Sequence, residues 1–337
     1  MKKIVIGILF FYLTLFSFQN IVFASNKEVI LGGDSIGLKF NTGVIVSGKY
    51  DVETINGVVK PWENSNIMVG DKIIMVGNVR INTIDNLLSC LNILKNESLN
   101  LTLLRDNLII NTEVDVIRTI NNEKTVGLYI KDSIVGIGTL TYIDSETSTF
   151  ASLGHGIKDK EVKMECSGTL LKSNVKSIKK GTIGVPGEKR ATISKNTIGS
   201  ILSNTNTGVY GVVKDLTYFK NRQKIKLSTV SQAKLGSAKL YTVINDNIIK
   251  CFDVKVIDVN YQTKKDIKGI KIQITDKTLI EECGGIIQGM SGSPIVQDGY
   301  LIGAVSHVVV DNPEIGYAVH VSFMDEDRSI IEDALIM

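Results

Sequence analysis

More than half of this 337-residue chain consists of short β-rich runs in which apolar residues lose helical spacing. From Lys124 onward, Gly, Asn and Asp turns separate runs such as VGLYIKDSIVGIGTLTYID, GVYGVVKDLTYF and KGIKIQITD. Many short strands of this kind are typical of antiparallel sandwiches or barrels, because β-α-β units would need helices between the strands. More than two hundred residues are enough for two packed barrels. Only the end, from about Ser322 to Ile336, has a helical pattern.

The region before Lys124 contains one clear helix. Asn82 or Thr83 can cap it, and apolar residues then recur at helical spacing, at Ile84, Leu87, Leu88, Leu91 and Leu94. Strand-like runs lie on both sides, SIGLKFNTGVIVSG before it and LNLTLLRDNLIINTEVDVI after it. We therefore predict a mainly β chain with a small α+β domain over residues 29–117 and a β domain over residues 124–337.

The N-terminus has the layout of a secretory signal. Lys2 and Lys3 precede an apolar run over residues 4–18, and small residues follow near Ala24. The run is shorter than the roughly 20 residues of a spanning helix, although adding residues 21–23 allows an uncleaved anchor. We predict a signal peptide or signal anchor over residues 1–24 and export of the rest of the chain.

Composition excludes several function classes. A formal net charge of +3 and 6% aromatic residues give no basic or stacking surface for nucleic acid. Four widely spread cysteines form no CxxC pair, and the chain has three histidines. We therefore expect no metal site and no cofactor.

A serine between glycines is the strongest chemical feature. Ser291 lies between Gly289 and Gly292 in GMSGSPIVQDGYLIGAV, where apolar strands follow at once. Such a stretch fits a structural turn, or a nucleophile on a tight loop whose N–H groups face a substrate oxygen. The loop at residues 181–193, GTIGVPGEKRATI, is basic at Lys189 and Arg190 and is expected to be solvated or to shape the substrate site.

A nucleophilic serine needs a base and an orienting acid. His155 lies between glycines in ASLGHGI and is favoured as the base, because loops present catalytic groups more often than strands do. His307 is the alternative, in a strand-like context. Asp276 and Asp215 are both candidates for the acid, and either can equally be a turn residue.

These motifs, in their order, resemble the SpoIVB peptidases, secreted serine peptidases of spore-forming bacteria with an N-terminal PDZ domain. The resemblance rests on GMSGSPIVQDGYLIGAVSHVVVDNPEIGYAVH, LGHGI, GVPGEK and VGLYIKDSIVGIGTLTYID. It implies His155, Asp276 and Ser291 as catalytic residues. The serine motif also resembles GDSGGP of the chymotrypsin superfamily, which implies a double β-barrel and an oxyanion hole made by the N–H groups of Gly289 and Ser291.

The first domain resembles a PDZ domain through a Gly-Leu pair, the GDKII turn and the following helix. The resemblance implies that the backbone of Gly37 and Leu38 binds a peptide carboxylate, supplied by a substrate, another protomer or this chain's own end. The alternative is a small α+β domain with no peptide ligand.

The resemblance implies a role in sporulation signalling, between the forespore and mother-cell membranes. There the enzyme would cleave itself near its N-terminus and cleave a membrane-tethered regulator, which activates an intramembrane protease and leads to maturation of a late sigma factor. The alternatives are an HtrA-like quality-control protease and a non-catalytic PDZ scaffold that binds peptides.

Overall fold

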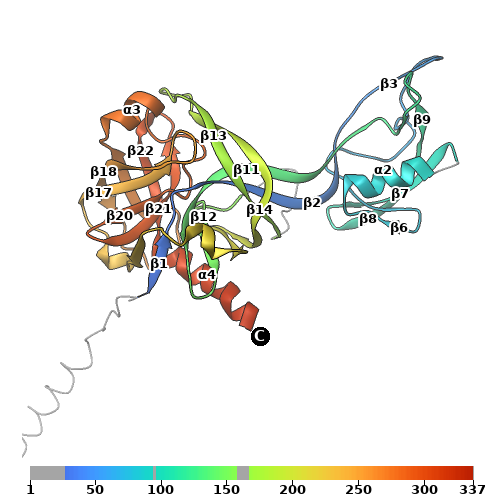
Figure 1. Ribbon diagram of the computed structural model, residues 1–337. Coiled ribbons are helices and arrows are strands. Elements are labelled where there is room, and N and C mark those ends of the chain that lie inside the picture. Colours follow the sequence, from blue (N-terminus) through green and yellow to red (C-terminus); the bar gives the residue numbers. More distant parts are fainter. Residues whose placement is uncertain (1–26, 94–95, 158–166, 337) are drawn as a thin grey trace, which may run out of the picture.

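The computed structural model describes residues 27–93, 96–157 and 167–336, and the predicted signal segment lies outside these ranges. A large β body and a smaller lobe make up the described chain (Figure 1). Two long strands, β2 (Ser35–Lys49) and β11 (Leu128–Ile143), run from one to the other. Within the described ranges, no helix is both long and apolar enough to cross a membrane. The prediction of a mainly β chain is confirmed.

Six strands of the large body close into a ring, which we call the first ring. Each strand pairs antiparallel with the next, and the last pairs with the first. Its core is made of large apolar side chains such as Phe40, Leu140 and Phe150. In order around the ring, the strands are β2, β11, β12 (Thr149–Ser152), β15 (Gly208–Val213), β14 (Glu188–Thr205) and β13 (Gly168–Lys179).

Six further strands close into a second ring in the same way, all antiparallel. Its core contains Leu240, Phe252 and Ile295. In order, these strands are β17 (Gly236–Val243), β18 (Ile249–Val259), β19 (Ile270–Ile274), β22 (Asn312–His320), β21 (Tyr300–Val309) and β20 (Pro294–Gln297). Helix α3 (Lys277–Cys283) packs in this core, whereas Phe219 of η1 (Leu216–Phe219) packs in the core of the first ring, and η2 (Val230–Gln232) precedes β17.

Two short strands and the C-terminal helix join the rings. Strand β1 (Glu28–Leu31) pairs with β11 and with β16 (Lys224–Leu227), and β16 runs parallel to β21. Helix α4 (Val321–Ile336) packs against strands of both rings, as the helical pattern at the end of the chain predicted. Its Arg328 is fully buried, donates to the Thr149 hydroxyl of β12 (2.6 Å) and pairs with Asp144 (3.4 Å), so polar contacts as well as apolar packing attach the helix to the first ring.

The smaller lobe has its own core, in which Leu87, Leu91 and Leu101 are buried. The predicted helix is present, and Asp132 of β11 accepts a hydrogen bond from the N–H of Ile84 at its start (3.1 Å). The elements are β3 (Val52–Thr54), β4 (Gly57–Val59), β5 (Lys72–Val76), β6 (Val79–Arg80), α2 (Ile84–Ile93), β7 (Ser98–Arg105), β8 (Leu108–Asp115), β9 (Ile117–Arg118) and β10 (Lys124–Thr125).

The structure corrects the predicted boundary and the predicted peptide site of the first domain. Gly37 and Leu38 lie within β2, paired on one side with β11 and on the other with β13, so their strand is not a loop that can receive a carboxylate. Leu38 is fully buried in the first ring, where its burial contributes about 2 kcal/mol to stability. A Cβ on Gly37 would lie 2.7 Å from Ile193, so the glycine serves close packing. The lobe therefore interrupts the β body between β2 and β11, and its likeness to a PDZ domain stays a prediction.

Candidate active site

Ser291 lies on the loop between α3 and β20, and two glycines shape this loop. Gly289 and Gly292 have φ values of +90° and +91°, a region that side chains with a Cβ rarely adopt. At Gly292 there is no space either, because a Cβ would lie 2.1 Å from the carbonyl oxygen of Thr139 and 2.4 Å from the nitrogen of Leu153. The glycines that frame the serine in the sequence are thus needed for the turn itself.

Strand β11 of the first ring fixes the loop through three hydrogen bonds. The N–H of Thr139 donates to the carbonyl of Ser291 (2.9 Å), and the Thr139 hydroxyl donates to the carbonyl of Gly289 (2.8 Å). Two residues further on, the Thr141 hydroxyl donates to the carbonyl of Gly292 (2.8 Å). Because the loop belongs to the second ring, these three bonds place the serine at the junction of the two rings.

Two other carbonyls of the loop also accept hydrogen bonds, and these bonds set the direction of two N–H groups. The carbonyl of Gln288 accepts from a backbone N–H of β14 (3.0 Å), and the carbonyl of Met290 accepts from the N–H of Ser293 (2.9 Å). In a trans peptide the C=O and the following N–H point in opposite directions. The N–H groups of Gly289 and Ser291 therefore point away from the interior, and within the described ranges neither donates a hydrogen bond. Two such free donors can bind a negatively charged oxygen.

His155 follows β12 and reaches Ser291. Its Nε2 lies 2.9 Å from the Ser291 Oγ, and its Nδ1 lies 2.9 Å from the carbonyl oxygen of Gly156. With the proton on Nδ1 donated to that carbonyl, Nε2 presents its lone pair to the serine hydroxyl. Burial lowers the pKa of His155, against a smaller opposing effect of the hydrogen bond to Gly156. The ring is therefore neutral, and able to accept a proton, at lower pH than an ordinary histidine.

The other two histidines have different surroundings. The ring of His307 lies beside that of His155, with 5.4 Å between ring centroids, but its side chain is not hydrogen bonded to Ser291. Both rings line an open cavity of about 620 Å³, together with Asn206, Lys265 and Asp266. His320 is buried, and its Nε2 lies 3.0 Å from the carbonyl of Asn260. The structure thus brings His155, rather than His307, to the serine.

Neither acidic candidate contacts His155. Asp276 is the N-cap of α3, where its carboxylate accepts from the N–H groups of Leu279 (3.1 Å) and Asp253 (3.3 Å). Asp215 is exposed and caps η1 by accepting from the N–H of Thr217. Among the described residues, no carboxylate is hydrogen bonded to His155, and the Gly156 carbonyl occupies the position where an acid would orient the ring.

Lys189 corrects another expectation. The chain from Glu188 onward is strand β14 and not part of a solvated loop, and Lys189 has 5% of its surface exposed whereas its neighbour Arg190 is exposed.

The sequence did not indicate a role for Thr139 and Thr141. The one available signal was two hydroxyls spaced two residues apart in an otherwise apolar run, which indicates one face of a strand.

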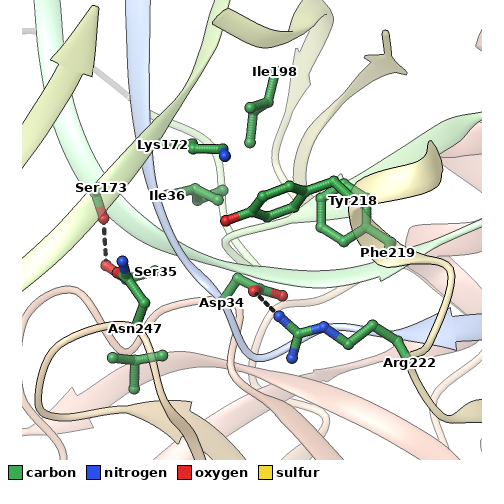
Figure 2. Close-up of a pocket in the computed structure, with 11 residues that line it drawn as sticks. Asp34, Ser35, Ile36, Lys172, Ser173, Ile198, Tyr218, Phe219, Arg222 and Asn247 are labelled. Atoms are coloured by element: carbon green, nitrogen blue, oxygen red, sulfur yellow. Dashed lines mark hydrogen bonds and ion pairs between the residues drawn. The ribbon is translucent and has the colours of Figure 1, made fainter. Parts of the chain in front are cut away.

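A second cavity, of about 50 Å³, lies at the beginning of β2 and is lined by neither Ser291 nor His155 (Figure 2). An ion pair between Asp34 and Arg222 (2.6 Å) closes one side, and the ammonium group of Lys172 lies 3.6 Å from the centre of the Tyr218 ring. Burial raises the pKa of Asp34, while Arg222 acts in the opposite direction. The space suits a few water molecules rather than a peptide.

Within the described ranges, no group of three or more His, Cys, Asp or Glu side chains is placed to hold a metal ion.

Comparisons with known proteins identify the family of the chain. The family model described as SpoIVB peptidase S55 matches residues 122–324, more than half of the chain. A search of the curated proteins found no match. Two solved structures of the Rv3671c protease from M. tuberculosis are similar to parts of the chain. The active form has 14% identity and a TM-score of 0.33 and covers 56% of this chain and 70% of its own. An inactive serine-to-alanine mutant has 11% identity and a TM-score of 0.33, with coverage of 58% and 82%.

Proposed function

Because the chain belongs to the SpoIVB peptidase S55 family and is a serine peptidase, we propose that Ser291 is its nucleophile and His155 its general base. The observation that carries this assignment is the 2.9 Å contact between the His155 Nε2 and the Ser291 Oγ. The free N–H groups of Gly289 and Ser291 form the oxyanion hole in this proposal.

The proposed reaction is acyl transfer. His155 takes the proton of the Ser291 hydroxyl while the oxygen attacks the carbonyl carbon of the scissile peptide bond. The carbonyl oxygen becomes an oxyanion and binds the two N–H groups. The protonated His155 then gives its proton to the leaving amine. In the second half, His155 takes a proton from water as the water oxygen attacks the acyl carbon, and it returns that proton to the Ser291 oxygen as the acid product leaves. The Gly156 carbonyl keeps the proton of the neutral ring on Nδ1 throughout.

We further propose that the chain is an exported endopeptidase of sporulation signalling. It would act between the forespore and mother-cell membranes, cleave itself near its N-terminus and cleave a membrane-tethered regulator, so that an intramembrane protease is activated. The family name and the Lys2-Lys3 pair before an apolar run support this role. Self-cleavage after the signal segment would release the enzyme from its anchor.

Self-cleavage can be tested on the full chain with a C-terminal tag. The wild type should accumulate a shorter form cut near its N-terminus, while Ser291→Ala should remain full length. Ser177→Ala, at an exposed serine of β13, is the matched control and should behave as the wild type. A short form of the same mass in the Ser291→Ala variant, made in a host without the wild-type enzyme, would contradict self-cleavage.

A further inference from the structure

The buried side chain of Lys189 packs against the loop that carries Ser291. The Nζ of Lys189 donates to the hydroxyls of Thr242 (2.9 Å) and Thr139 (3.3 Å). Thr242 is on β17 of the second ring and Thr139 on β11 of the first, while Lys189 itself is on β14. The side chain therefore crosses from one ring to the other at the place where the loop is fixed.

Each partner of the lysine is itself bound to the loop. Thr139 uses its own proton to bind the carbonyl of Gly289 (2.8 Å), so its lone pairs are free to accept from Lys189. Thr242 also accepts from the hydroxyl of Ser293, two residues after the nucleophile (3.0 Å). The stem of Lys189 fills the space behind Gly289, where a Cβ would lie 3.1 Å from the stem carbons. The ammonium group is thus the common donor of a network that ends on both sides of Ser291.

We propose that the Lys189 side chain is a positioning residue for the peptidase reaction, and that its hydrogen bonds to Thr139 and Thr242 keep the oxyanion hole formed. The proposal rests on the assignment of Ser291 as nucleophile. Lys189 touches no substrate atom. It acts by orienting the Thr139 hydroxyl toward the Gly289 carbonyl, and that bond fixes the peptide between Gly289 and Met290, which lies between the two peptides that carry the N–H groups of Gly289 and Ser291.

The energetics favour a role in activity over a role in stability. No carboxylate among the described residues pairs with Lys189, and the titratable group that acts on it is the Cys283 thiol of α3. Burial lowers the pKa of Lys189 to about 7. Burying an amine without a charged partner is unfavourable, so an apolar side chain of the same length would serve folding at least as well. If Lys189 only filled space, methionine could replace it without a loss of peptidase activity.

The test compares Lys189→Met with the wild type by covalent labelling with a fluorophosphonate probe. The probe phosphonylates the serine with loss of fluoride, and its saturation kinetics separate binding (KI) from the chemical step (kinact). We expect Lys189→Met to remain folded and to keep its KI, while kinact falls about 10- to 100-fold, less than the loss of an oxyanion-hole donor itself. Lys195→Met, at an exposed lysine of the same strand, is the control and should label as the wild type.

A second variant tests the network. Thr139→Val removes the hydroxyl that links Lys189 to Gly289 and keeps its shape, so it should lower kinact similarly, and the double variant should be little slower than either single one. Unchanged kinact in Lys189→Met would overturn the inference, as would additive losses or a Lys189→Met chain that does not fold. Absence of labelling in the wild type would instead refute the assignment of Ser291.

Discussion

Replacing Lys189 by methionine should change how the stability of the β body depends on pH. The ordinary pKa of a lysine is 10.5, and burial lowers that of Lys189 to about 7. Between these two values the unfolded chain binds more protons than the folded one, so the free energy of unfolding rises with pH. The slope is about 1.4 kcal/mol per pH unit where the folded lysine is neutral and the unfolded one charged.

From pH 7 to pH 9 this linkage amounts to about 2 kcal/mol, because the folded lysine is still half protonated at the lower pH. Urea unfolding of the wild type and of Lys189→Met, followed by far-UV circular dichroism at both pH values, measures it. All other titrating groups are common to the two proteins, so their effects cancel in the difference. The wild type should gain about 2 kcal/mol on the variant between pH 7 and pH 9. A difference that stays constant with pH would refute the reasoning that Lys189 is a buried lysine without a charged partner.

Two further predictions concern the proposed roles of His155 and Asp276. The rate of fluorophosphonate labelling should rise with pH to a plateau with a midpoint below 6.5, because burial lowers the pKa of His155 and the protonated ring cannot accept the serine proton. A midpoint above 6.5 would show that the ring is not in the described environment. Asp276→Asn should leave the labelling rate unchanged, because asparagine caps a helix as well as aspartate does and the carboxylate has no contact with His155. A fall of about 10⁴-fold, as expected for loss of a triad acid, would restore Asp276 to the site.

The sequence predicted the features that local pattern determines. Turn-separated apolar runs predicted a mainly β chain, and helical spacing predicted α2 and α4. The glycines at positions 289 and 292 predicted a tight turn around Ser291, because their backbone conformation is a local requirement. Glycines on both sides of His155 likewise indicated a ring presented at the end of a strand.

Features that depend on tertiary contacts were not predictable in this way. The sequence Gly37-Leu38 matches that of a carboxylate-binding loop. In the structure it lies in β2, and strands more than ninety residues away in sequence pair with both edges of β2. Lys189 stands next to exposed Arg190 in a basic stretch, and only the alternation of a strand separates the buried residue from the exposed one. Asp276 is followed by a short helix, so its position before Ser291 reflects helix capping. No local pattern reveals which distant residue fills a space behind a loop.

The central claim is that Ser291, activated by His155, is the nucleophile. The most direct measurement is to label the wild-type chain with a fluorophosphonate and to locate the adduct by peptide mass spectrometry. The account predicts a single adduct on Ser291, absent from Ser291→Ala and formed at a rate lower by orders of magnitude in His155→Ala. Labelling that persists in Ser291→Ala, or that proceeds at the wild-type rate in His155→Ala, would contradict it.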